Sequence, residues 1–204
     1  MDIYTREYDE KRPLVCIDEV PKQLIGEVRV PVSGIKGKAA RYDTEYKRNG
    51  TCVIFMSSAP LNGWRRAEVT ERRTKTDFAR QIKKLATIDF PDAEKIVLVL
   101  DNLNIHTIGS LYKAFVPEEA RMLRDKFEIH YTPKHGSWLN MAETEINVLV
   151  NHGLSKRIST IEQMKKEVSA WNKARNKIAC KINWRFSTDD ARIKLKRLYP
   201  QFVT

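Results

Sequence analysis

Short apolar runs separated by turn-forming residues are the dominant pattern of this 204-residue chain. Runs of this length, bounded by Gly, Pro, Asn or charged residues, are typical of buried β-strands. Five strands are predicted on this basis, over residues 14–18, 51–58, 64–69, 95–100 and 127–131. Two of the apolar runs are followed directly by an aspartate, Asp18 and Asp101. An acid in that position is expected at the edge of the sheet, where a cation can reach it.

Two Asn-Gly pairs divide the first half of the chain. Residues 22–50 contain Gly, Lys and Arg and end in Asn49-Gly50, which predicts an irregular basic excursion followed by a turn. The second pair, Asn62-Gly63, separates two strand-like runs. Because Asn-Gly tolerates the positive backbone angles of tight turns, these two runs are predicted to form an antiparallel hairpin.

Helical spacing and capping residues predict the helices. Thr74 followed by Asp77 resembles a capping arrangement, and Ser137 follows a breaker-rich turn as a good N-cap. The predicted helices cover residues 75–88, 117–126 and about 137–152, followed by two that begin near Ser159 and Ser187, the last ending before Pro200. Three antiparallel strands followed by alternating helices and strands specify an α/β fold with a mixed sheet and flanking helices.

This order of elements is that of the ribonuclease-H-like fold, in which the first and fourth strands are parallel neighbours. The ends that carry Asp18 and Asp101 would then lie side by side. We expect a catalytic domain over residues 1–155 and a basic C-terminal helical extension over residues 156–204, packed on the same domain.

Composition narrows the class of protein. A hydrophobic content of 42% in a chain of this length can bury one substantial core without disulfides, and the three cysteines are widely separated. The four histidines show no ligand spacing. The longest aliphatic run, 96–100, is far too short to span a bilayer, and the N-terminus is polar, so a cytoplasmic protein is expected.

Positive charge is concentrated at the C-terminal end. The net charge is +11, and from residue 151 onward 13 Lys or Arg stand against four Asp or Glu, a balance of +9. Such clustering is either a solvated face or a nucleic-acid-binding surface, because clustered cations gain free energy by releasing counterions from DNA. The residues expected to bind DNA are Lys134, His135, Lys165, Lys166, Lys173 and Arg175.

Three carboxylates are candidates for one metal site. Asp18 and Asp101 end predicted strands, and Glu143 lies on the predicted helix at the margin of its apolar stripe. Helix phase favours Glu143 only slightly, and Glu145 at the opposite margin is its rival. Clustered carboxylates raise one another's pKa values unless a cation binds to them, and Mg²⁺ prefers such oxygen ligands.

The sequence blocks around these acids are long and ordered. The stretch from Asp101 to His106, followed by that from Tyr131 to Glu143, resembles the second and third catalytic blocks of DDE transposases. It is similar to the bacterial insertion-sequence branch of the mariner superfamily. The segment around Cys16 to Glu19 and that from Arg41 to Thr51 share the likeness, so the resemblance covers nearly the whole chain.

The resemblance implies a domain that cuts DNA at transposon ends and joins the freed 3′ hydroxyl to target DNA, using a two-metal site with Mg²⁺ or Mn²⁺. Asp18, Asp101 and Glu143 take the places of the catalytic and metal-binding triad. Asn102, His106 and Asn140 fall within the same blocks and are expected to support the metal ligands or position DNA. The implied protein works as a homodimer on DNA in the nucleoid.

One feature departs from the family pattern. Members of the family usually carry N-terminal helix-turn-helix domains, whereas Asp18 lies only 17 residues after Met1. We therefore expect the catalytic half alone, with a separately encoded helix-turn-helix subunit as a possible partner. Two alternatives stay open: a noncatalytic DNA-binding remnant that competes or pairs with a full-length transposase, and a host nuclease acting on RNA-DNA hybrids or DNA junctions.

Overall fold

A five-stranded mixed sheet forms the centre of the computed structural model, which describes residues 2–134 and 136–194. The strands lie in the order β3-β2-β1-β4-β5. Their bounds are β1 Leu14–Glu27, β2 Tyr46–Ala59, β3 Trp64–Thr70, β4 Ile96–Leu100 and β5 Phe127–Tyr131. β2 pairs antiparallel with both β1 and β3, whereas β4 pairs in parallel with both β1 and β5. This pairing confirms the predicted ribonuclease-H-like fold.

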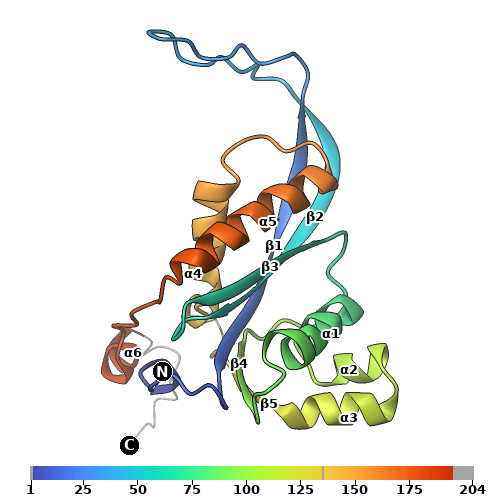
Figure 1. Cartoon of the computed structure of the whole chain (residues 1–204), viewed down its shortest axis with the longest axis vertical. Helices are drawn as coiled ribbons and strands as arrows, with labels where there is room; N and C mark the ends of the chain where they lie inside the picture. Colours follow the sequence, from blue (N-terminus) through green and yellow to red (C-terminus); the bar gives the residue numbers. More distant parts are fainter. Residues whose placement is uncertain (1, 135, 195–204) are drawn as a thin grey trace, which may run out of the picture.

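Helices cover both faces of the sheet (Figure 1). The α-helices are α1 Lys75–Lys84, α2 Gly109–Ala114, α3 Pro117–Lys126, α4 Ala142–Val148, α5 Ile161–Ile178 and α6 Thr188–Lys194. Shorter helical turns are η1 Asp2–Tyr4, η2 Leu85–Asp89, η3 Ser137–Leu139 and η4 Leu149–Gly153. None of the helices in the described ranges is long and apolar enough to cross a membrane.

Alternation along β1 assigns one core to each face of the sheet. Val15 and Ile17 pack with α1, α2 and α3, whereas Leu14 and Cys16 pack with α4 and α5. Successive side chains of a strand point to opposite faces, so a strand buried on both faces needs an unbroken apolar run. α5 buries Met164 and Val168 in the same core as α4, and the division into domains at residue 155 remains a prediction.

The parallel register between β1 and β4 sets the position of the two aspartates. Cys16 pairs with Val99, and Asp18 and Asp101 each lie two residues beyond that pair. A step of two residues returns to the same face of a strand, so both aspartates belong to the face that α4 and α5 cover. Asp101 directly follows β4, as predicted, but β1 does not end at Asp18, which still pairs with Met56 of β2.

The basic excursion predicted over residues 22–50 is much shorter in the structure. β1 and β2 extend as a long antiparallel pair, so only residues 28–45 lie between them. These residues form an arm that projects from the body (Figure 1). Asn49-Gly50 is not a turn: Gly50 has a φ of +95° within β2, where the register shifts by one residue against β1. Gly50 therefore permits a β-bulge in a continuous strand.

The hairpin predicted around Asn62-Gly63 is confirmed. β2 and β3 pair from Val53–Thr70 to Ala59–Trp64 across this turn, and Gly63 has a φ of +80°. A Cβ at Gly63 would lie 2.3 Å from the carbonyl oxygen of Ala179, beyond the end of α5. The turn thus needs glycine both for its backbone angle and for close contact with the C-terminal segment.

The helix predicted over residues 137–152 is broken in the structure. Ser137 does not cap this helix but begins η3, which ends at Leu139. Asn140 lies between η3 and α4, and α4 continues into the π-helical turn η4. The predicted capping box at Ser159 is displaced by one residue, since the hydroxyl of Thr160 accepts the N–H of Gln163. The short helix α2 was not predicted, and the predicted end of the last helix before Pro200 lies outside the described residues.

The remaining predicted helices are confirmed with small changes. α1 has the predicted capping box at Thr74 and ends in the π-helical turn η2, and α3 spans the predicted residues. Ser187 caps α6 by accepting the N–H of Asp190. Cys16 and Cys52 are buried free thiols, and Cys180 is half-buried and also free.

Candidate active site

Three acidic side chains from separate segments line one open pocket of about 320 Å³. Asp18 comes from β1, Asp101 follows β4, and Glu143 belongs to the first turn of α4. Asp18 is 8% exposed, and Asp101 and Glu143 are half-buried. The fold therefore brings together the three residues that the sequence singled out, which are 83 and 42 positions apart.

Two asparagines hold the segments around the pocket. The buried amide of Asn140 donates to the carbonyl of Ile17, next to Asp18, at 2.8 Å, and its oxygen accepts the N–H of Ala142 at 3.2 Å. Asn140 thus ties the start of α4 to β1. Asn102 donates to the carbonyl of Thr132 at 2.6 Å and joins the ends of β4 and β5. Neither amide contacts one of the three acids directly.

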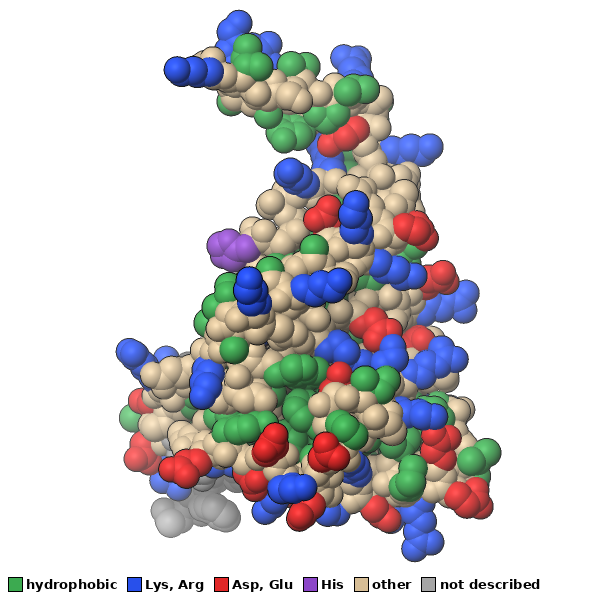
Figure 2. Space-filling model, in the orientation of Figure 1, with side chains coloured by type: hydrophobic (Ala, Val, Ile, Leu, Met, Phe, Trp, Pro, Cys, Tyr) green, Lys and Arg blue, Asp and Glu red, His purple; other side chains and the backbone are tan. Residues whose placement is uncertain are grey.

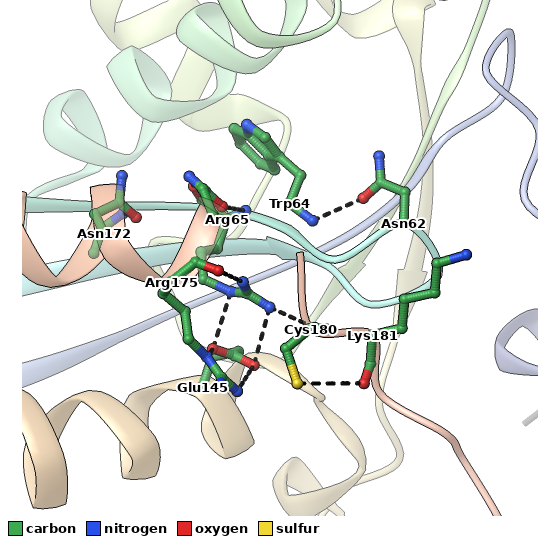
Figure 3. Close-up of polar contacts among 10 residues, drawn as sticks. Asn62, Trp64, Arg65, Glu145, Asn172, Arg175, Cys180 and Lys181 are labelled. Carbon is green, nitrogen blue, oxygen red and sulfur yellow. Dashed lines mark hydrogen bonds and ion pairs between the residues drawn. The ribbon is translucent and has the colours of Figure 1, made fainter. Parts of the chain in front are cut away.

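A buried ion cluster fixes the rotation of α4 (Figure 3). Glu145 is wholly buried, with Oε2 3.0 Å from Nε of Arg65 on β3 and Oε1 3.1 Å from Nη2 of Arg175 on α5. Arg65 also donates to the carbonyls of Arg175 and Cys180. Because Glu145 faces this cluster, Glu143 is left facing the pocket. The choice between the two glutamates, which helix phase left open, thus has a structural reason.

His106 joins Asp101 to a fourth carboxylate. Its Nδ1 lies 2.5 Å from Oδ1 of Asp101 and its Nε2 lies 3.0 Å from Oε2 of Glu19, and the ring is completely buried. Burial lowers the pKa of His106, but the hydrogen bonds to Asp101 and Glu19 outweigh it and raise the pKa to about 9. At neutral pH the ring is protonated and donates to both carboxylates.

The two aspartates have opposite electrostatic environments. The hydrogen bond from His106 lowers the pKa of Asp101, and the N–H of Leu103 and the charge of Arg73 act in the same direction. Burial, and to a smaller extent the charges of Glu19, Asp101 and Glu143, outweigh the N–H of Glu19 and raise the pKa of Asp18 to about 7. The charged form of Asp18 is therefore disfavoured, first by its burial and then by the neighbouring acids.

The pocket supplies oxygen donors, which suit a hard divalent cation. Within residues 2–134 and 136–194, no group of three or more His, Cys, Asp or Glu is arranged tightly enough to hold a metal ion outright. The raised pKa of Asp18 nonetheless marks a negative site that a cation would stabilise. The oxygen donors of Asp18, Asp101 and Glu143 thus fit a hard divalent cation such as Mg²⁺ or Mn²⁺.

The basic residues expected to bind DNA fall into three groups. Lys165, Lys166 and Lys173 are exposed on α5, and Lys134 is exposed before η3. Lys and Arg side chains are spread over the face on which α5 lies (Figure 2). The guanidinium of Arg175 is engaged by Glu145, which removes it from the proposed DNA surface. His135 lies outside the described residues.

Sequence reasoning missed three functional-site neighbours. Glu19 stood in the first motif block, but strand alternation places it opposite Asp18, on the face where His106 lies. Arg73, from the loop before α1, lines the pocket and pairs with Glu19 at 3.2 Å. Arg65 is buried in β3. Only Glu19 had a signal, its position directly after the first aspartate.

Comparisons with known proteins bear on the family and on the fold. The profile of the DDE superfamily endonuclease family matches residues 13–165. A search of the curated proteins gives no match to this chain. Among solved structures, the Mos1 mariner paired end complex with Mn is similar, with a TM-score of 0.58 and 16% identity over 85% of this chain. The Mos1 paired-end complex with the left transposon end and a pre-cleavage Mos1 transpososome give TM-scores of 0.57 and 0.56, each at 16% identity over 85% of this chain.

The chain spans about half the length of these Mos1 chains, covering 51%, 51% and 52% of them in turn. At this level of identity the likeness supports the fold, and the family profile supports the family.

The buried cluster predicts different roles for the two glutamates of α4. Glu145→Ala leaves the buried Arg65 without its carboxylate and is expected to lower the free energy of unfolding by about 3 to 5 kcal/mol. Glu143→Gln, at the half-exposed pocket side, should change it by less than about 1 kcal/mol. Urea unfolding followed by circular dichroism measures both. Equal, small effects would show that Glu145 does not fix the helix.

The burial of Asp18 among other acids predicts that removing its charge stabilises the metal-free protein. With a pKa of about 7 against an ordinary 3.8, the folded state holds this proton more tightly than the unfolded chain does. That contribution is complete below about pH 4 and is lost as the pH rises through about 7. Asp18→Asn is therefore expected to raise the free energy of unfolding in EDTA by about 1 to 4 kcal/mol at pH 8, and by less at pH 5.

The matched variant, Asp101→Asn, is expected to change the free energy of unfolding in the opposite direction. Asp101→Asn removes a carboxylate that the protonated His106 stabilises, so it should lower stability in the same buffer at pH 8. A stability loss for Asp18→Asn that grows with pH would contradict the crowding.

Proposed function

The chain belongs to the DDE superfamily of endonucleases, and we propose that it is the catalytic domain of a transposase. In this role it cuts DNA strands at the ends of a mobile element and joins the freed 3′ hydroxyl to target DNA. The observation that carries the proposal is the single pocket lined by Asp18, Asp101 and Glu143. The fold shared with Mos1 structures, whose complexes contain transposon ends, supports it.

Asp18, Asp101 and Glu143 are the proposed ligands of a two-metal site for Mg²⁺ or Mn²⁺. When bound, such ions stabilise charge on the attacking and leaving oxygens of a phosphodiester. His106 holds one oxygen of Asp101 and leaves the other for a cation. Asn140 holds the start of α4 against β1, so that Glu143 stays beside Asp18. Water is the proposed nucleophile of cutting and a DNA 3′ hydroxyl that of joining.

DNA is the proposed partner. Lys134, Lys165, Lys166 and Lys173 are exposed and carry the proposed phosphate contacts, which position DNA without identifying its sequence. Recognition of the element ends is assigned to a helix-turn-helix module and paired cutting to a homodimer working in the nucleoid. Both assignments rest on the resemblance to the mariner superfamily.

Loss of one metal ligand is expected to abolish catalysis. Supercoiled plasmid is incubated with the protein in Mg²⁺ or Mn²⁺, and nicked and joined products are counted on a gel. Asp101→Asn should lower the nicking rate by more than about 100-fold. Mutation of even a residue that only supports a metal ligand typically lowers metal affinity or activity by roughly 10- to 100-fold. Asp125→Asn, an exposed aspartate paired with Arg124, is the control and should retain the rate.

Three results decide against the proposal. If Asp101→Asn nicks as fast as the unmodified chain, Asp101 has no catalytic part. If the unmodified chain binds DNA in a salt-dependent manner but neither nicks nor joins it in either metal, the protein is a noncatalytic DNA-binding remnant. Products from RNA-DNA hybrids or DNA junctions in preference to duplex DNA would instead indicate a host nuclease.

A further inference from the structure

One cation stands among the acids of the pocket. Of the described residues that line it, Arg73 is the single Lys or Arg, beside Asp18, Glu19, Asp101 and Glu143. It comes from the loop between β3 and α1, and its side chain is 42% exposed. A phosphodiester that enters this pocket is an anion approaching carboxylates, so the position of the one guanidinium matters for binding.

Arg73 is anchored by a buried chain of contacts that ends on Asp101. Its Nη1 lies 3.2 Å from Oε1 of Glu19, and the other oxygen of Glu19 lies 3.0 Å from His106. The side chain of Glu19 is 1% exposed and that of His106 0%. A flexible side chain is thus attached at one nitrogen to a rigid, buried support. The guanidinium therefore has a defined place next to a catalytic acid.

Most of the hydrogen-bonding capacity of Arg73 remains available. A guanidinium has five N–H donors in a planar fork. Within the part of the chain that the structure describes, Glu19 is its one hydrogen-bonding partner. The fork geometry matches two oxygens of a phosphate, which a lysine does not match in the same way. A half-exposed, anchored arginine with free donors is suited to an anionic ligand.

We propose that Arg73 binds the reacting phosphodiester, donating from its guanidinium to a non-bridging oxygen of the phosphate in the acidic pocket. This inference rests on the proposed function and adds a residue outside the acid triad. Glu19 is the positioning residue, because it holds Arg73 on one side and His106 on the other. The alternative, that Arg73 only balances the charge of Glu19, gives different results in the experiment below.

The test compares Arg73→Ala and Arg73→Gln with Arg80→Ala. Arg80 is an exposed arginine of α1 that pairs with Asp77 and does not line the acidic pocket. The first readout is the affinity for a fluorescent DNA duplex in Ca²⁺, whose looser coordination disfavours the reaction. Loss of one phosphate contact should reduce the slope of log affinity against log salt by about one.

The second readout is the plasmid nicking rate in Mg²⁺. Both Arg73 variants are expected to nick about 10- to 100-fold more slowly, whereas Arg80→Ala should match the unmodified chain. The third readout is the rise in melting temperature on adding Mn²⁺ without DNA. It should persist in the Arg73 variants, because removing a cation does not weaken the attraction of the pocket for metal.

The outcomes separate the two proposals. Unchanged nicking and an unchanged salt slope in both Arg73 variants would overturn the role of Arg73. So would loss of the Mn²⁺ effect, since Arg73 would then act by organising the acids. An unmodified chain that does not nick DNA in any metal would overturn the proposed function instead. If Arg73→Ala does not fold, Arg73→Gln, which keeps a donor for Glu19 but no charge, decides alone.

Discussion

The parallel pairing of β1 with β4 is the constraint on which the rest of the site depends. The pair Cys16–Val99 places Asp18 and Asp101 at the same level and on the same face of the sheet. Two carboxylates held there repel each other, and the sheet cannot relax this repulsion without losing backbone hydrogen bonds in a strand buried on both faces. The surrounding residues stabilise the charges of the two aspartates to different extents.

His106 offsets the charge of Asp101, whereas Asp18 accepts only the backbone N–H of Glu19 within the described part of the chain. A protonated imidazole between Asp101 and Glu19 lowers the pKa of Asp101, and Asp18 is left with a pKa raised to about 7. If the proposed metal site is correct, a divalent cation bound in this pocket would offset the charge that the fold leaves on Asp18. Stability given up at such a position is typical of active sites.

α4 is positioned from three directions, which explains why a short helix can present Glu143 accurately. Asn140 ties its start to β1, and Glu145 ties its inner side to Arg65 and Arg175. A buried glutamate with two arginines is costly to desolvate, but a broken pair costs more, so the cluster specifies one rotation of the helix. Glu143, two residues before Glu145, is then directed to the pocket.

Local patterns in the sequence predicted the elements whose structure is decided locally. β5 and α3 match their predicted bounds because Pro117 begins the helix and an apolar run gives the strand. The break at Asn140 was not predictable, since it depends on a hydrogen bond to Ile17, 123 positions away. The choice of Glu143 likewise required Arg65, whose burial within β3 could not be predicted from the sequence of that strand. Long-range polar contacts, rather than apolar periodicity, set these features.

The location of bound metal decides whether Asp18, Asp101 and Glu143 form one metal site. Crystals of the chain with duplex DNA and Mn²⁺ allow manganese to be identified by its anomalous scattering. We expect two manganese peaks about 4 Å apart, ligated by carboxylate oxygens of Asp18, Asp101 and Glu143. Manganese bound elsewhere, or a site that uses Glu145 in place of Glu143, would contradict the proposed metal site.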